Sequence, residues 1–93
     1  MYRMTYRVNT DRIIFTQLGN EGVVYEMEKN DYVTLNETMF EILSGLEQGK
    51  TPPDLVAQFC REYQIDEADC LHAVNEAVAE LVANGYVTAQ PHP

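Results

Sequence analysis

The spacing of apolar positions changes from a strand-like to a helix-like period near residue 36. Before that point lie three short segments, Arg12–Leu18, Gly22–Glu28 and Tyr32–Leu35. They are rich in β-branched and aromatic residues, or they alternate apolar with polar positions. Polar turns, including Gly19-Asn20, separate them. This pattern predicts strands, and strands so close in sequence pair most simply as an antiparallel meander.

The alternation predicts which strand residues face the core, because successive side chains point to opposite faces of a sheet. The inward set expected from the second and third strands is Val23, Tyr25, Met27, Val33 and Leu35. Tyr32 and Thr34 would face outward. Tyr6 and Val8, within the polar segment Met1–Asn9, are compatible with an additional short edge strand.

After residue 36 the apolar positions follow helical spacing, which predicts helices at Glu37–Gln48, Pro52–Tyr63 and Asp66–Asn84. Each begins with a residue whose side chain can accept hydrogen bonds from free amides. These capping residues are Asn36, Thr51 and Asp66. The buried faces expected for the first two helices comprise Met39, Phe40, Leu43, Leu46, Leu55, Val56, Phe59 and Tyr63.

This order of elements predicts an α+β fold of winged helix-turn-helix-like form, with a three-stranded antiparallel sheet followed by three helices. The chain of 93 residues is long enough for one small domain with one modest core. We assign residues 1–88 to that domain and expect Tyr86-Val87 to return onto the sheet. Residues 89–93 contain two prolines and are expected to form a frayed, disordered tail.

The third helix has a composition that argues against nucleic-acid binding. It contains five acidic residues and no Lys or Arg: Asp66, Glu67, Asp69, Glu76 and Glu80. In a DNA-binding winged helix this element faces phosphates, which would repel it. The formal charge of −9 for the whole chain also disfavours nucleic acid and anionic membranes. A basic or neutral peptide partner is compatible with that charge, and so is a solvated surface.

The same helix is apolar over more of its circumference than the stripe of about 100° that one packing partner requires. Its apolar residues are Leu71, Val74, Val78 and Leu81, flanked by Cys70, Ala73, Ala77 and Val82. Two explanations remain open. The helix packs against both the sheet and the other helices, or part of its surface lines an unfilled ligand groove.

The chain contains no recognisable catalytic or metal-binding motif. His72 and His92 are its only histidines, and Cys60 and Cys70 lack the close paired spacing of zinc sites. We therefore expect no enzyme activity, no metal and no cofactor. The cysteines are compatible with one disulfide between neighbouring helices or, as we expect in a cytoplasmic protein, with two reduced thiols. Neither a signal peptide nor a membrane span is predicted.

The third strand would lie at the edge of the meander, where its outward N–H and C=O groups lack partners. Such an edge can accept an extended peptide as an added strand, with the third helix as the opposite wall. The alternatives are that the N-terminal segment or a second copy of the chain covers this edge.

Several segments resemble the PqqD-like family. They are Gly22-Val-Val-Tyr-Glu-Met27, Asp31-Tyr-Val-Thr-Leu-Asn36, Ile42-Leu43, Gly49-Lys-Thr51, Leu55-Val56, Tyr63, and the spacing Val78, Leu81, Gly85-Tyr86-Val87. The resemblance extends over about Asp11–Val87. The turn Glu28-Lys-Asn-Asp31 lacks the Pro that is usual in the pyrroloquinoline quinone members, so the stand-alone lasso-peptide members are the more similar branch.

The resemblance implies a RiPP precursor peptide recognition element. Such a protein is a non-catalytic adaptor that binds the leader of a ribosomally synthesised precursor peptide and delivers it to a separate modifying enzyme or leader peptidase. The leader would add to the third strand and lie against the third helix. The implied peptide-binding residues are Asp31, Tyr32, Val33, Thr34, Leu35, Leu71, Val74, Asn75 and Val78. A winged-helix transcription regulator is the alternative function, and a monomer and an edge-mediated dimer are both compatible with the sequence.

Overall fold

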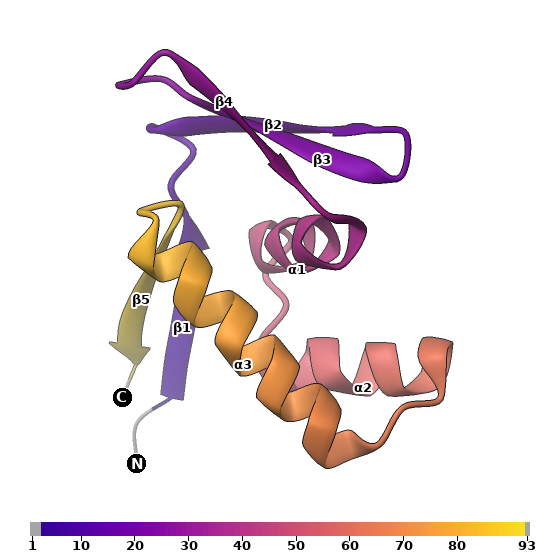
Figure 1. The fold of residues 1–93 in the computed structure, drawn as a ribbon. Coiled ribbons are helices and arrows are strands. Elements are labelled where there is room, and N and C mark those ends of the chain that lie inside the picture. The colour runs from indigo at the N-terminus through magenta and orange to yellow at the C-terminus, as the bar shows by residue number, and fades with distance from the viewer. Residues whose placement is uncertain (1–2, 93) are drawn as a thin grey trace.

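The computed structural model describes residues 3–92 as two small sheets and three helices (Figure 1). The elements are β1 (Arg3–Val8), β2 (Ile13–Leu18), β3 (Glu21–Glu26), β4 (Asp31–Leu35), α1 (Glu37–Glu47), α2 (Pro52–Tyr63), α3 (Glu67–Ala83) and β5 (Val87–His92). In Figure 1 the sheet of β2, β3 and β4 forms the top layer, with α1 directly below it. The predicted α+β class is confirmed.

The meander is antiparallel and has the order β2-β3-β4. Its two turns contain Gly19 (φ 64°) and Asn30 (φ 52°), and these are residue types that tolerate a positive φ. The register places Tyr25 opposite both Ile14 and Tyr32. Side chains that face each other across strands share one face of a sheet. This row therefore crosses the whole meander on one side.

The face of β3 that turns toward the helices is the opposite of the one predicted. The predicted inward set is Val23, Tyr25 and Met27. Val24 is instead fully buried, and Met27 is 37% exposed. Phe40 of α1 explains why the face that contains Gly22 and Val24 is the inward one. Phe40 packs so close to Gly22 that a Cβ added there would lie 2.3 Å from the Phe40 Cδ1. Because apolar residues occur on both faces of β3, alternation alone does not select a face.

The helices begin as predicted. The Asn36 Oδ1 accepts a hydrogen bond from the Met39 N–H at 2.8 Å. Thr51 and Asp54 form a reciprocal capping box, with distances of 3.3 Å and 2.9 Å. Asp66 caps α3 through its carboxylate. These local contacts fix where each helix starts, and they therefore fix where β4 ends.

The core is a single cluster to which the helices, β1 and the meander contribute. The predicted helix faces are largely confirmed, but two positions differ. Ile42 is 1% exposed and belongs to the core, although it lies beside the predicted stripe of α1. Tyr63, predicted to be buried, is 50% exposed. It is the last residue of α2, and its ring packs on Phe59 with the ring centroids 5.9 Å apart.

The two ends of the chain pair with each other as β1 and β5. The N-terminal segment therefore does not extend the meander, and residues 89–92 form part of β5 instead of a frayed tail. The reason is long-range. The Asn9 Nδ2 donates to the Gly85 carbonyl at 2.9 Å, and the Thr88 Oγ1 donates to the Asn9 Oδ1 at 2.9 Å. The predicted edge strand lies within a segment that includes residues 1–2, and the predicted tail includes residue 93. These three residues lie outside the described part of the chain.

Candidate functional site

The outer edge of β4 is open in the part of the chain that the structure describes, because β4 pairs only with β3 there. The Met27 N–H donates to the Arg12 carbonyl at 3.0 Å. Counting back along β3 from Met27, every second residue therefore turns its N–H and C=O groups toward β2. The remaining β3 residues turn toward β4 and pair with Asp31, Val33 and Leu35. This leaves the N–H and C=O groups of Tyr32 and Thr34 pointing away from the sheet.

A side chain already occupies one of these edge groups. The Tyr32 N–H donates to the Asp31 Oδ1 at 2.9 Å. This contact is independent support for the outward direction of the Tyr32 N–H. It also means that a strand added at β4 has to replace the carboxylate.

The sheet has a second edge at β2, and its surroundings are different. The Ile13 N–H bonds the Asn9 carbonyl at 3.1 Å, so the first outward N–H of β2 is already paired. The hollow next to Gln17 is lined mainly by polar residues, including Glu41 and Lys50. The hollow beside this edge therefore suits polar side chains of a peptide better than apolar ones.

An apolar hollow of about 240 Å³ lies near the end of β4. It is lined by Thr38, Ile42, Phe59, Tyr63, Ile65, Cys70, Ala73 and Val74. Thr38 is in the first turn of α1, which begins directly after β4. The volume is below the range of about 300–1,000 Å³ that is typical of drug-sized ligands. The hollow therefore suits a side chain of a bound peptide better than a complete small molecule.

The α3 residues expected to form the wall of the groove lie on different faces of the helix. Val74 and Val78 are in the core, with 1% and 4% exposure. Leu71 lines a separate hollow with α2, and Asn75 lines one that includes Met4 and Tyr6 of β1. The structure therefore does not bring Leu71 and Asn75 next to β4.

Ala73 and Ala77 lie on the other side of the buried stripe of α3. At about 100° per residue, Ala73 and Ala77 flank Val74 on one side and Leu71 and Asn75 flank it on the other. Ala73 reaches the hollow that contains Thr38, next to β4. The i, i+4 spacing of Ala73 and Ala77 does not by itself identify this side from the sequence, because Ala79 and Ala83 have the same spacing on another side of α3.

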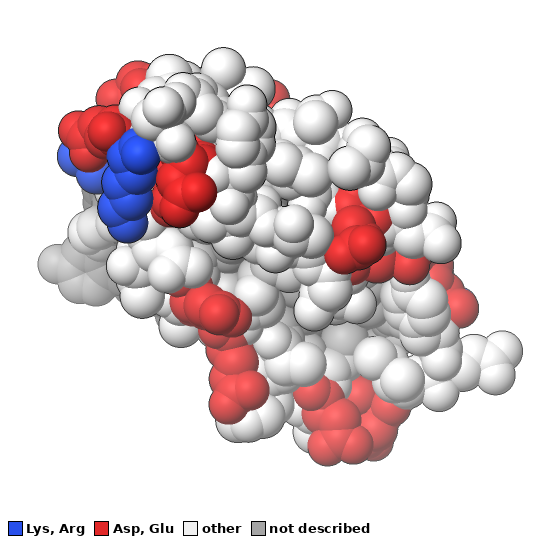
Figure 2. Space-filling view, turned by 45° about the horizontal axis from the view of Figure 1, so that its top comes forward, with Lys and Arg blue, Asp and Glu red and all other residues white. Residues whose placement is uncertain are grey.

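Acidic side chains lie near Tyr63, which lines this hollow: the charges of Glu41, Glu37 and Glu62 all act on it. In Figure 2, Asp and Glu are distributed over the visible face, whereas Lys and Arg are confined to one end. Burial raises the pKa of the Glu41 carboxyl, and the nearby charges of Glu62 and Glu37 raise it further. The Tyr63 hydroxyl, 3.5 Å from the Glu41 Oε1, opposes that shift. The negative charge near this hollow therefore favours basic or neutral peptides.

The described residues contain no group of three or more His, Cys, Asp or Glu side chains arranged to hold a metal ion. His72 forms an exposed contact of 3.1 Å with Glu76 one turn later. Cys60 and Cys70 are free thiols. No helix within residues 3–92 is long and apolar enough to cross a membrane.

The sequence profile of the family described as coenzyme PQQ synthesis protein D (PqqD) matches residues 21–87. The chain belongs to the PqqD family. The matched segment contains β4, the apolar hollow and all of α3, so the resemblance drawn from the sequence is confirmed. No sequence among curated proteins matches the chain.

Two solved structures share the PqqD-family fold of this chain. TbiB1 in complex with the TbiA(beta) leader peptide has a TM-score of 0.78 and 22% identity, covering 87% of this chain and 93% of that one. Lasso peptide synthetase B1 complexed with the leader peptide has a TM-score of 0.80 and 24% identity, covering 89% of this chain and 96% of that one. At these identities the similarity shows a common fold.

Proposed function

We propose that this PqqD-family protein is a non-catalytic adaptor that binds the leader segment of a ribosomally synthesised precursor peptide. The leader adds as an antiparallel or parallel strand to the open edge of β4 and lies against the Ala73 side of α3. The adaptor then delivers the precursor to a separate modifying enzyme or leader peptidase in the cytoplasm. Family membership supports this proposal, and so do the two solved relatives, both of which are leader-peptide complexes.

The observation that carries the proposal is the combination of an open strand edge with an apolar hollow near the end of that strand, where Thr38 of α1 lines it. The edge supplies the N–H and C=O groups of Tyr32 and Thr34, which recognise any extended backbone. The hollow below Thr38 supplies selectivity, because only certain positions of an added strand can place an apolar side chain there. The β2 edge has the first property without the second.

The magnitudes are sufficient for useful affinity. Each ladder hydrogen bond contributes about 0.5–1.5 kcal/mol net, and each fully buried apolar side chain of the peptide contributes about 1.5–3 kcal/mol. The cost of ordering the peptide offsets part of this gain. Four edge groups and one or two anchors give about 3.5–12 kcal/mol before that cost. With an association cost of at least about 4 kcal/mol, the net supports dissociation constants no tighter than the micromolar range, which about −8 kcal/mol represents.

Other functions receive less support. The exposed side of α3 carries His72, Glu76 and Glu80 and no cation, which is unfavourable for a DNA-reading helix. No arrangement of nucleophile, base and orienting group occurs among the described side chains that form hydrogen bonds. We therefore propose a binding role without chemistry.

The decisive experiment removes one edge donor and leaves the fold intact. Thr34→Pro deletes an N–H that points away from β3, and edge strands tolerate proline at such positions. We expect the affinity for a fluorescently labelled leader of the neighbouring precursor gene to fall about tenfold or more, equivalent to about 1.4 kcal/mol or more. Fluorescence anisotropy measures binding, and circular dichroism checks the fold.

Gln17→Pro is the matched control. Gln17 occupies the corresponding outward-facing position on the opposite edge of the sheet, so this substitution imposes the same backbone restriction away from the proposed site. Leader binding should remain close to that of the unmodified protein. Equal losses in both variants, or no leader binding by the unmodified protein, would overturn the proposal.

A further inference from the structure

The face of the meander that points away from the helices is rich in apolar side chains, which share it with Thr16, Thr34 and Glu21. Antiparallel sheets of this kind normally present polar side chains to water on their outer face. Here the outward positions include Ile14, Leu18, Val23, Tyr25 and Tyr32, which we call the outer sheet face. Ile14, Leu18 and Tyr32 are 58%, 67% and 70% exposed. Neither the fold nor the leader groove accounts for these side chains.

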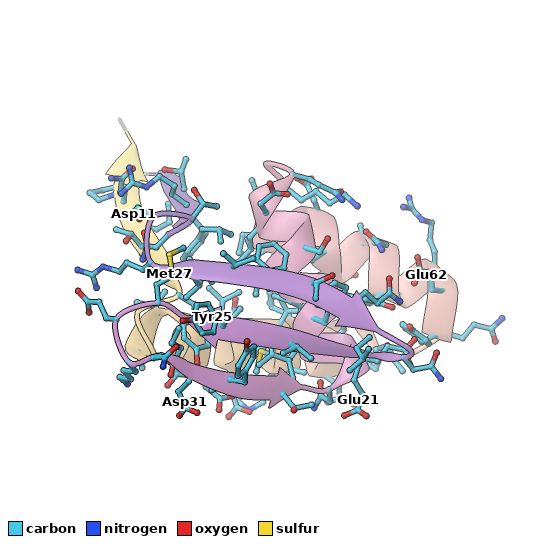
Figure 3. All side chains as sticks on the ribbon, turned by 90° about the horizontal axis from the view of Figure 1, so that it is seen from above. Asp11, Glu21, Tyr25, Met27, Asp31 and Glu62 are labelled. Atoms are coloured by element: carbon cyan, nitrogen blue, oxygen red, sulfur yellow. The ribbon has the colours of Figure 1, made fainter. Side chains whose placement is uncertain are left out.

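Four of the five residues are contiguous, and Leu18 lies farther along β2, beyond Thr16 and opposite Glu21. Tyr25 lies opposite Ile14 on β2 and Tyr32 on β4, and the two tyrosine rings are 4.9 Å apart. Val23 lies two residues from Tyr25 on the same side of β3. Figure 3 looks down onto this face and shows Tyr25 on the central strand. A contiguous apolar surface on a folded chain marks an interaction site more often than isolated exposed residues do.

The charges at the margin restrict the type of partner. The outward positions of the three strands include Glu21, which lies opposite Leu18, and no Lys or Arg. Figure 3 shows Glu21 and Asp31 at the strand ends that border the face. With a net charge of −9, the chain repels a second copy of itself and attracts a partner with cationic groups at its rim. The complementary surface is apolar at its centre and carries Lys or Arg around it.

The outer sheet face is continuous with the open edge through Tyr32. The Tyr32 ring belongs to the face, whereas its N–H and C=O belong to the edge. A leader strand added to β4 would extend the same sheet by one strand, and every second side chain of that strand would join the same face. A partner seated there would contact both the adaptor and its peptide.

Building on the proposed function, we propose that the outer sheet face is the docking surface for the enzyme that processes the precursor. The enzyme contributes an apolar patch with a cationic rim and covers Ile14 and Leu18 together with the leader strand. Because part of this surface exists only when the leader is bound, the enzyme binds the adaptor–leader complex more tightly than the free adaptor. Recruitment is thereby coupled to the presence of substrate.

The test separates docking from leader binding. Ile14 and Leu18 lie on β2, two strands away from the β4 edge, so changing them leaves the leader groove intact. The double variant Ile14→Asp, Leu18→Asp places two charges on the β2 side of the face. The probe is the purified processing enzyme encoded beside this protein, measured by biolayer interferometry with and without synthetic leader. Because each charge replaces an apolar side chain that the enzyme would cover, we expect enzyme affinity to fall about tenfold or more, with leader affinity unchanged.

Two further variants keep the result interpretable. Ile14→Thr, Leu18→Thr removes the apolar surface with residues that favour strands, so it addresses the case in which the aspartate variant does not fold. Leu71→Asp adds a charge at an apolar residue of comparable type, 45% exposed, in the hollow between α2 and α3. The first should reproduce the loss of enzyme binding, and the second should leave it intact.

Several results would overturn the inference. They are enzyme binding that is unchanged in both β2 variants, leader binding that is lost together with enzyme binding, and enzyme affinity that is independent of leader. Sedimentation velocity provides one more: a dimer of the unmodified protein that the β2 variants dissociate would assign the face to a second copy of the chain. If the unmodified protein does not bind leader at all, the proposed function fails instead.

Discussion

The carboxylate of Asp31 accepts a hydrogen bond from the backbone N–H of Tyr32, 2.9 Å away, on the open edge of β4. The free protein thus protects one edge donor with its own side chain. Charged residues at exposed edges are a common protection against unwanted strand pairing. In this protein the same contact competes with the proposed ligand.

Removing that competitor should strengthen leader binding. In Asp31→Ala the Tyr32 N–H is free before binding, so the peptide no longer replaces an existing hydrogen bond. The gain is about 0.5–1.5 kcal/mol, equivalent to a dissociation constant about two- to tenfold lower. Asp31→Asn retains the acceptor and should change affinity less. Titrations at high salt remove the contribution of the lost charge. Weaker binding by the alanine variant would show that Asp31 contacts the leader directly.

The two sides of α3 should respond differently to substitution. Ala73→Phe fills the hollow beside β4 and should weaken leader binding about tenfold or more, equivalent to about 1.4 kcal/mol or more. Leu71→Ala, on the opposite side of the buried stripe, should leave it nearly unchanged. Isothermal titration calorimetry measures both constants. If Leu71→Ala weakens leader binding and Ala73→Phe does not, the leader contacts the side of α3 that the sequence resemblance implies.

Gly22 and Phe40 should be energetically coupled. A Cβ at position 22 would lie 2.3 Å from the Phe40 Cδ1, so Gly22→Ala forces the ring or the strand to move. Such overpacking costs about 1–3 kcal/mol of unfolding free energy. Phe40→Ala removes the ring but keeps the Cβ, which would lie 2.8 Å from the added Cβ, so it relieves only part of the clash. The double variant should still be more stable than the sum of the single changes predicts. Urea unfolding measures all four proteins, and simple additivity would contradict the packing argument.

Tyr86 should make stability fall at high pH. Burial, followed by the hydrogen bond from its hydroxyl to the Glu26 Oε2 at 2.7 Å, raises the pKa of Tyr86 to about 12. In the unfolded chain the pKa is about 10. The folded state therefore holds the proton more tightly, and its stabilising contribution is complete below pH about 10 and is lost as pH rises toward about 12.

Tyr86→Phe isolates this contribution from those of the other tyrosines. At neutral pH the variant should be less stable by about 1.5–3 kcal/mol, because it lacks a hydrogen bond to a charged acceptor. The difference from the unmodified protein should shrink as pH rises through the same window. Urea unfolding at a series of pH values measures it, and a constant difference would argue against a protonated Tyr86 in the folded state.

The two cysteines should differ in reactivity. Burial raises the pKa of the Cys70 thiol, and the neighbouring Cys60 raises it further. Cys70 is also only 2% exposed, whereas Cys60 is half-buried. Since the thiolate is the reactive form, iodoacetamide should label Cys60 first and Cys70 only after unfolding. Mass spectrometry of the native protein, with the urea-unfolded protein as control, identifies the labelled residue.

Some features of the proposed site follow from local sequence. The caps Asn36, Thr51 and Asp66 and the spacing of apolar residues predict the helices, and the segment ending at Leu35 predicts the edge strand. The same reasoning does not place Leu71 and Asn75, because a helix that is apolar over much of its circumference does not reveal which of its sides faces a given strand. That side depends on how α3 crosses α1 and α2.

By itself the sequence determined the number and order of the meander strands and helices, the starts of the helices and the open edge at β4, because each depends on residues a few positions apart. Only the tertiary structure decided that Val24 and not Tyr25 faces the core, that β1 pairs with β5, and that Ala73 lines the same hollow as Thr38. These outcomes depend on contacts between distant residues, such as Gly22 with Phe40 and Asn9 with Gly85, and on which packing buries the most apolar surface.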